Sequence, residues 1–104
     1  MRAGFFGMHW PTEYGGQGAD PAYQGLVDKA LTAHNAPIIF NTIGLNWTGP
    51  LLLDVGTEDD RKRYIKNILT GDDIWCQGFS EPDHGSDLGN VQTRAVRDGD
   101  EYVV

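Results

Sequence analysis

Glycine and proline divide this chain into short segments, and this division limits the regular elements that it can form. Gly15, Gly16 and Gly18 interrupt any helical or strand period within residues 1–20, so we expect a packed, irregular opening segment there. Further breaks bound three helical stretches, at Pro21, Pro37, Gly49-Pro50, Gly56 and Gly71. Because proline clashes with the preceding helical turn, the second stretch is expected to be interrupted near residues 49–50.

The three stretches predict helices over about residues 21–70. The first begins at Asp20-Pro21, where aspartate can accept hydrogen bonds from the free amides and proline loses no bond. The second lies within about residues 38–55, from Ile38 to Val55, and Gly56 ends it. The third begins at Thr57, where Asp60 makes an acidic variant of the capping box, and it ends at Gly71. Apolar spacing gives the first and third helices buried faces, at Tyr23, Leu26, Val27, Ala30 and Leu31, and at Tyr64, Ile65, Ile68 and Leu69.

After Gly71 the pattern changes from helical to strand-like. Residues 74–80 are short, aromatic and bounded by turn residues, which predicts a strand, and residues 81–89 then form a loop. Asp98-Gly99 predicts a hairpin between strands at 93–97 and 101–104. The fold class is therefore α+β, with helices over about 21–70 followed by β strands over about 74–104. Because the last strand runs to the final residue without a stop, we expect a fragment.

Charge and cysteine content exclude several classes of function. Eight Lys and Arg against 15 Asp and Glu give a net charge of −7, which opposes binding to nucleic acid or to an anionic membrane surface. Cys76 is the single cysteine, so it can form neither an internal disulfide nor a thiolate zinc site by itself. No apolar run is long enough to span a bilayer, and the N-terminus does not read as a signal peptide. We expect a cytoplasmic protein with no nucleic-acid partner, no membrane partner and no bound metal.

The loop at residues 81–89 and the segment before it hold the candidate functional residues. Residues 83–87 bring acid, imidazole and hydroxyl together, but catalytic triads are assembled across a fold, and the spacing also fails for an EF-hand. Dinucleotide fingerprints, phosphate loops and nucleophile elbows are absent from the sequence. Ser80, Gly85 and Ser86 offer hydroxyls and close backbone approach, which suit the polar edge of a flat ligand or a phosphate; a plain structural loop is the alternative. Trp75 and Phe79 suit packing on a ring system or in a core.

Residues 75–88, with the sequence Trp-Cys-Gln-Gly-Phe-Ser-Glu-Pro-Asp-His-Gly-Ser-Asp-Leu, resemble the flavin-binding signature of the acyl-CoA dehydrogenases. The core of that signature is Ser/Thr-Glu-Pro, two variable positions, then Gly-Ser-Asp. Residues 10–18 are similar to the family's opening segment, and residues 56–58 to the start of a basic helix that ends at residues 69–72. Residues 98–104 resemble the family's hairpin, so the resemblance covers nearly the whole chain.

The resemblance implies an FAD-dependent enzyme of lipid metabolism that oxidises an acyl-CoA to a 2,3-enoyl-CoA, with FAD as the hydride acceptor. It assigns residues 1–72 to an N-terminal helical domain and residues 73–104 to the start of a middle β domain. Glu81 and Asp87 would orient the loop. The implied FAD-binding residues are Gln77, Phe79 and Ser80 along the ring and Gly85 and Ser86 near the pyrophosphate, with Ser86 also close to the acyl-CoA.

The family's catalytic base lies in a C-terminal helical domain that this chain does not match. We therefore expect no catalytic residue among the 104 and no activity from this chain alone. The implied partners are the acyl-CoA substrate, an electron-transfer flavoprotein or another acceptor, and further subunits of a homo- or hetero-oligomer. A flavin oxidase or monooxygenase of the same fold stays open, as does a non-catalytic subunit that completes a flavin site. His84 replaces a residue that is usually small, and it either points into solvent or contacts a substrate phosphate.

Overall fold

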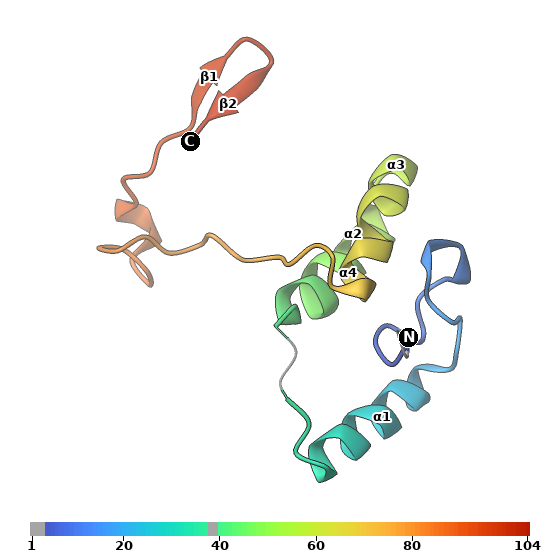
Figure 1. Cartoon of the computed structure of the whole chain (residues 1–104). Coiled ribbons are helices and arrows are strands. Elements are labelled where there is room, and N and C mark those ends of the chain that lie inside the picture. Colours follow the sequence, from blue (N-terminus) through green and yellow to red (C-terminus); the bar gives the residue numbers. More distant parts are fainter. Residues whose placement is uncertain (1–3, 38–39) are drawn as a thin grey trace.

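The computed structural model describes residues 4–37 and 40–104 and consists of helices followed by a small hairpin (Figure 1). Its α+β class agrees with the prediction. The elements are α1 (Pro21–Ala33), α2 (Gly49–Val55), α3 (Glu58–Asp60), α4 (Lys66–Thr70), β1 (Val96–Asp98) and β2 (Glu101–Val103). Short 3-10 turns at Thr12–Tyr14 and Leu88–Asn90 and π-helical turns at Gly44–Thr48 and Arg61–Ile65 complete them.

Helix α1 begins as its sequence predicts, but its apolar face is largely exposed. The Asp20 carboxylate accepts a hydrogen bond from the amide of Ala22 at 2.8 Å, and Pro21 occupies the first helical position. Tyr23 and Leu26 are more than half exposed to solvent, at 55% and 61%. The helix therefore forms from local signals, while most of its apolar face has no cover within the described residues.

The predicted interruption of the second helix at Gly49-Pro50 is wrong. The backbone stays helical from Gly44 through Val55, and the hydrogen-bond pattern changes instead. The amide of Gly49 donates to the carbonyl of Gly44, five residues back, so the turn before Pro50 is π-helical. This wider turn suits a proline, which has no amide to donate and crowds the carbonyl four residues before it. Ile38, where the helix was expected to begin, lies outside the described residues.

The third helix confirms its predicted start, end and buried face. The Thr57 hydroxyl accepts from the Asp60 amide at 3.2 Å, and the Asp60 carboxylate accepts from the Thr57 amide at 3.1 Å. Elements α3, the π turn Arg61–Ile65 and α4 follow one another, and the helix ends at Gly71 with a φ of +73°. Ile65 and Ile68 are the fully buried residues of its apolar face.

The core forms where the irregular opening segment packs against these helices. Trp10, Tyr14, Ile65 and Ile68 are the buried apolar residues of the described chain. A Cβ at Gly49 would overlap the Trp10 ring, so the indole lies directly on the backbone of α2. The Tyr14 hydroxyl donates to the Glu58 carboxylate at 2.6 Å. The glycines and aromatic residues of the opening segment thus attach it to the third helix.

The strand predicted over residues 74–80 is not observed. The segment has no strand partner among the described residues, and regular β structure requires one. The later hairpin exists but is short: Val96 pairs with Val103 and Asp98 pairs with Glu101. Its two-residue loop is Gly99-Asp100, one position later than the predicted Asp98-Gly99. Gly99, with a φ of +62°, therefore takes the first loop position.

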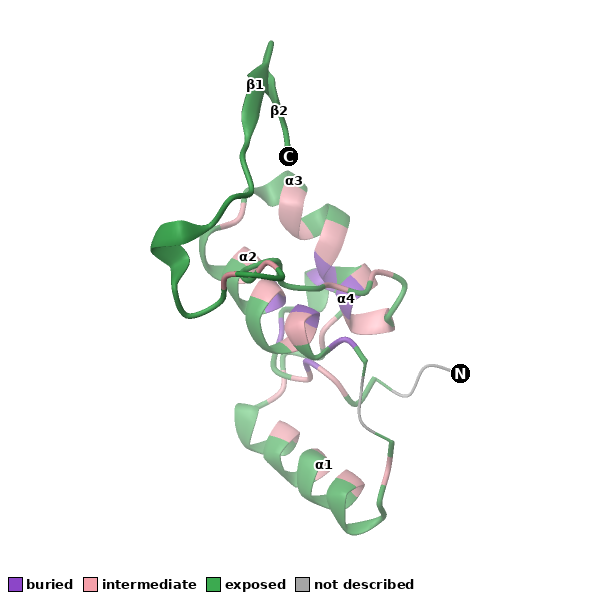
Figure 2. Ribbon diagram, turned by 90° about the vertical axis from the view of Figure 1, so that its left-hand side faces the viewer, coloured by how far each residue is buried: buried purple, intermediate pink, exposed green. Residues whose placement is uncertain are grey.

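The molecule is extended for its length (Figure 2). Its radius of gyration is 17.1 Å, whereas a compact chain of this length has about 13 Å. Figure 2 shows the buried positions gathered in the helical part, while the loop and hairpin are almost entirely exposed. None of the helices in the described parts of the chain has the length and apolarity required to cross a bilayer.

Candidate functional site

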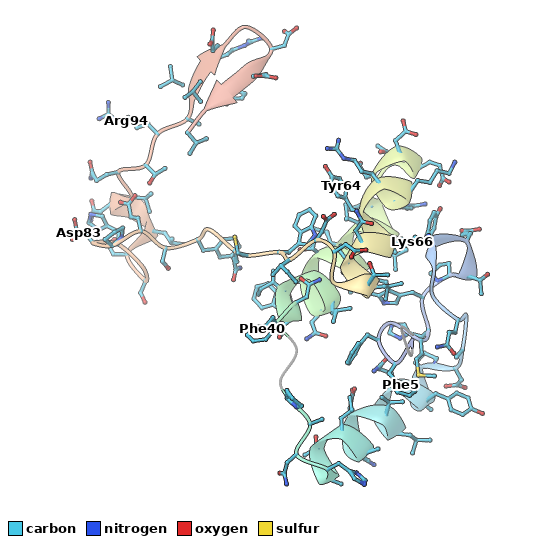
Figure 3. The ribbon with its side chains drawn as sticks, viewed as in Figure 1. Phe5, Phe40, Tyr64, Lys66, Asp83 and Arg94 are labelled. Carbon is cyan, nitrogen blue, oxygen red and sulfur yellow. The ribbon has the colours of Figure 1, made fainter. Side chains whose placement is uncertain are left out.

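The segment that carries the candidate residues leaves the helices as exposed, extended chain after Trp75 (Figure 3). The Phe79 ring is 72% exposed, and Gln77, Gly78 and Ser80 are exposed as well. Gly78 has open space around it, since an added Cβ would meet nothing within 4 Å. The main-chain amides and carbonyls of residues 77–80 are therefore accessible to a ligand that lies along them.

A cavity of about 390 Å³ separates this segment from the second helix. That volume falls within the range of small-molecule sites, about 300–1,000 Å³. Aromatic and aliphatic side chains make up much of its lining, as in most cofactor pockets. The helical wall includes Ile43, Trp47 and Leu51, and the facing wall includes Gln77, Gly78 and Phe79.

Glu81 holds the loop that follows. One carboxylate oxygen accepts from the Gln92 amide at 2.6 Å, and the other accepts from the Thr93 amide at 2.9 Å and the Thr93 hydroxyl at 2.5 Å. These bonds, that of the Thr93 hydroxyl first, hold the pKa of Glu81 below its ordinary value. The Asp87 carboxylate similarly accepts from the Asn90 side chain at 2.6 Å. Both acidic residues accept hydrogen bonds from residues that directly follow the loop.

The loop folds back at its start, which brings Gly85 beside Ser80. The Glu81 amide donates to the His84 carbonyl at 2.9 Å, and the His84 amide donates to the Glu81 carbonyl at 3.2 Å. A Cβ at Gly85 would lie 3.5 Å from the Ser80 hydroxyl oxygen. Ser86 is exposed next to this corner, and His84 is half-buried. Figure 3 shows Asp83, in this loop, well away from the helices.

Asn41 is a buried polar residue that the sequence reasoning missed. It is 2% exposed, and its side chain bonds to three different main-chain groups around the start of the extended segment. An asparagine just before a helix is ordinarily interpreted as a cap. The bonds of Asn41 reach residues 27 to 34 positions further along the chain, and no local sequence pattern indicates them.

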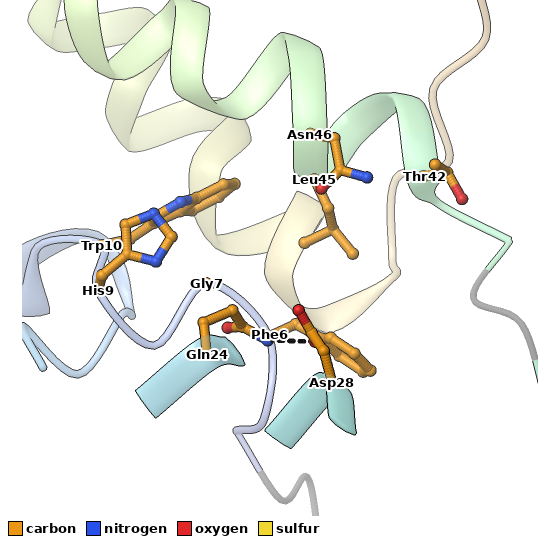
Figure 4. A pocket seen from close by; sticks show the side chains of 9 residues that line it. All are labelled: Phe6, Gly7, His9, Trp10, Gln24, Asp28, Thr42, Leu45 and Asn46. Carbon is orange, nitrogen blue, oxygen red and sulfur yellow. Dashed lines mark hydrogen bonds between the residues drawn. The ribbon is translucent and has the colours of Figure 1, made fainter. Parts of the chain in front are cut away.

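A second cavity, of about 270 Å³, lies between the opening segment, α1 and the second helix (Figure 4). Its lining includes His9, Trp10, Gln24 and Asp28. Gln24 already bonds to Asp28 at 3.0 Å, to the Phe5 carbonyl at 3.0 Å and to the Met8 amide at 3.3 Å. The Gln24 side chain is therefore engaged in joining α1 to the opening segment.

The sequence resemblance is supported by comparison with protein families. A family model described as "Acyl-CoA dehydrogenase, N-terminal domain" matches residues 1–72, more than half of the chain. The chain belongs to the acyl-CoA dehydrogenase family.

Related acyl-CoA dehydrogenases match almost the whole chain. Acyl-CoA dehydrogenase IpdE1 of Mycolicibacterium smegmatis is 41% identical over 94% of this chain and 25% of its own length. The solved structure of the Tcur3481-Tcur3483 steroid ACAD matches 96% of this chain and 26% of its own with 42% identity and a TM-score of 0.76. The solved structure of the ChsE4-ChsE5 complex from Mycobacterium tuberculosis matches 98% of this chain and 26% of its own, with 37% identity and a TM-score of 0.74. This chain spans about a quarter of the length of these relatives.

In this acyl-CoA dehydrogenase chain, the predicted site residues fall into two groups. Gln77 and Phe79 line the 390 Å³ cavity, whereas Ser80, Gly85 and Ser86 lie at the corner of the loop outside its lining. A flavin needs an apolar wall for its ring and small, accessible main-chain positions for its polar edge and phosphates. The first group offers the wall, and the second group offers the small, accessible positions. The residues present therefore fit FAD. Among the described residues, no cluster of three or more His, Cys, Asp and Glu side chains could hold a metal ion.

Proposed function

We propose that this chain is the part of an FAD-dependent acyl-CoA dehydrogenase that contributes one wall of the flavin site. The supporting observation is the exposed segment 77–80, whose residues 77–79 line a ligand-sized cavity against the second helix in a chain of this family. The complete protein oxidises an acyl-CoA to a 2,3-enoyl-CoA, and an electron-transfer flavoprotein or another acceptor takes the electrons onward. Residues 73–104 belong to the start of its middle β domain.

For each site residue we propose the role that the family resemblance implies. The main chain of Phe79 and the hydroxyl of Ser80 hydrogen-bond the pyrimidine edge of the flavin, with Gln77 alongside the ring. Gly85 lets a pyrophosphate approach the backbone, and the Ser86 hydroxyl donates to a phosphate or to the acyl-CoA. When bound, FAD supplies the acceptor for the hydride that leaves the acyl chain.

Glu81 supports this site from within the loop. A carboxylate close to a pyrophosphate would repel it, but both Glu81 oxygens are already engaged by Gln92 and Thr93. These bonds hold the Glu81 carboxylate against residues 92 and 93, which leaves Gly85 and Ser86 as the loop positions for the ligand. This agrees with an orienting role for Glu81.

Two similar solved structures guide the choice of substrate and assembly to test. One is named as a steroid ACAD, and at 42% identity it makes steroid-derived acyl-CoA thioesters the first substrates to test. Both it and the ChsE4-ChsE5 complex are named with two different subunits. This favours a second role to be tested in parallel, in which the chain is part of one subunit of a hetero-oligomer.

The test uses Gly78, whose surroundings are open in the chain itself. In the full-length protein with its partner subunit, the Gly78→Leu variant is expected to retain less FAD after gel filtration, because the new side chain occupies the space of the flavin ring. Gly25→Leu is the matched control, since Gly25 also has open space around it and lies in α1, away from the site. Visible flavin absorbance per protein measures the result.

Three outcomes decide the proposal. The proposal is supported if wild-type protein and Gly25→Leu bind FAD, and if that FAD loses its colour when a steroid-derived acyl-CoA is added. Gly78→Leu should then be folded but colourless. Equal FAD content in both variants would remove residues 77–80 from the flavin site. A wild-type protein that keeps no FAD would overturn the proposed function as a whole.

A further inference from the structure

Asn41 is the buried polar group that connects the helices to the exposed segment. Its side-chain amide donates to the Ile68 carbonyl at 3.0 Å and to the Asp73 carbonyl at 2.9 Å. Its side-chain oxygen accepts from the Trp75 amide at 3.0 Å. One side chain thus joins the last turn of α4, the turn after it and the first residues of the extended segment.

The surroundings of Asn41 hold its side chain in one orientation. A Cβ at Gly44 would overlap the Asn41 side chain, so the absence of a side chain at Gly44 makes room for it. An asparagine amide has two donor hydrogens, and both are used, one on the Ile68 carbonyl in the last turn of α4 and one on the Asp73 carbonyl just after it. Because the group is 98% buried, reversing the amide would leave donors facing donors, which is unfavourable.

The position of Trp75 determines the path of the residues after it. Beyond Trp75, residues 76–80 make no backbone hydrogen bond to the described residues, so the bond to Asn41 is the last main-chain anchor before residues 77–80. The Trp75 ring packs edge-on against Tyr64, with centroids 5.4 Å apart, which restrains the same point. Gln77 and Phe79 follow Trp75 by two and four residues.

We propose that Asn41 is a positioning residue of the flavin site, which fixes where the main chain leaves the helices and thereby the path of residues 77–80. This inference rests on the proposed function for its ligand, but the anchoring of the segment does not. In this role Asn41 touches neither substrate nor cofactor, and it acts through the Trp75 amide.

Two variants remove the anchor by different routes. Asn41→Leu keeps the number of side-chain heavy atoms and the branch at Cγ, and it deletes all three bonds. Gly44→Ala leaves Asn41 in the sequence but displaces its side chain, so it tests the idea if Asn41→Leu does not fold. Asn67→Leu is the matched control, because Asn67 bonds to the Asp73 side chain at 3.1 Å and not to the segment.

Hydrogen exchange is measured on the full-length, FAD-free protein, and FAD affinity and the visible flavin spectrum on the reconstituted one. Loss of a buried hydrogen bond predicts that the Trp75 amide exchanges about tenfold faster in Asn41→Leu and Gly44→Ala. FAD affinity falls and the flavin spectrum shifts in both, while Asn67→Leu loses thermal stability without either change.

The outcomes separate the two proposals. If wild-type protein binds no FAD, the proposed function fails, and the exchange rate at Trp75 alone decides whether Asn41 anchors the segment. If FAD binds and both variants match Asn67→Leu in exchange and in flavin spectrum, Asn41 has no positioning role and the inference is overturned.

Discussion

At the scale of single residues, Glu81 shows how one carboxylate can organise a loop. It joins the start of the loop to amides 11 and 12 residues further on. Its folded pKa lies below the unfolded value, so its contribution to loop order is complete above the ordinary glutamate pKa of about 4.3 and is lost as the pH falls through the lower folded pKa.

We therefore expect the amides of Gln92 and Thr93 to be protected near pH 7 and to lose this protection selectively below about pH 4. Glu81→Ala is expected to remove it at every pH. Hydrogen exchange followed residue by residue measures the effect, with Glu101→Ala as the control because Glu101 lies in the hairpin. Protection that is insensitive to both pH and Glu81→Ala would contradict the role.

The residue scale also marks the limit of what the sequence can predict about the site. Glu81 and Asp87 were expected to orient the loop, and their bonds to nearby residues fit that expectation. Asn41 was not found, because its partners are distant in the chain and asparagine before a helix has an ordinary local explanation. The roles of Gln77, Phe79, Ser80, Gly85 and Ser86 stay predictions.

At the scale of elements, signals that act within one turn predict structure well. The capping box of Thr57 and Asp60, the start of α1 at Pro21 and the end of the third helix at Gly71 all depend on neighbouring residues. The strand expected at residues 74–80 depends on a partner strand, which its own sequence does not contain. The helix through Pro50 needed a π-helical turn that no propensity indicates.

The capping box offers a test at this scale. Thr57→Ala removes the side chain that accepts from the Asp60 amide and should lower the free energy of unfolding by about 0.5–2 kcal/mol. Urea denaturation followed by far-ultraviolet circular dichroism measures it. Asp59→Ala is the control, since Asp59 lies in the same turn outside the capping pair. Equal losses in both variants would mean that general helix propensity, and not the cap, is being measured.

At the scale of the whole molecule, the helical part and the hairpin differ in what holds them together. The core packs Trp10 and Tyr14 against Ile65 and Ile68, whereas every residue of β1 and β2 is exposed. A two-stranded hairpin without further cover is at best marginally stable in water. The radius of gyration of 17.1 Å reflects this division.

For the 104-residue chain by itself, we expect backbone amides in β1 and β2 to exchange with solvent almost as fast as those of an unfolded peptide. Amides within α4, such as that of buried Ile68, should exchange far more slowly. Mass-spectrometric hydrogen exchange on the purified chain resolves the two regions. Hairpin protection equal to that of Ile68 would mean that the strands pair with another molecule or dock on the helices.

The contact between Trp10 and Gly49 has a consequence for how sequences of this kind can diverge. The indole occupies the volume that any side chain at position 49 would need, so the two positions are coupled. A larger residue at 49 is acceptable only after the ring at 10 has been reduced, and the reverse order passes through an overpacked intermediate. Accessible evolutionary routes through this pair therefore make the smaller residue first, and the order of mutations matters as much as their identity.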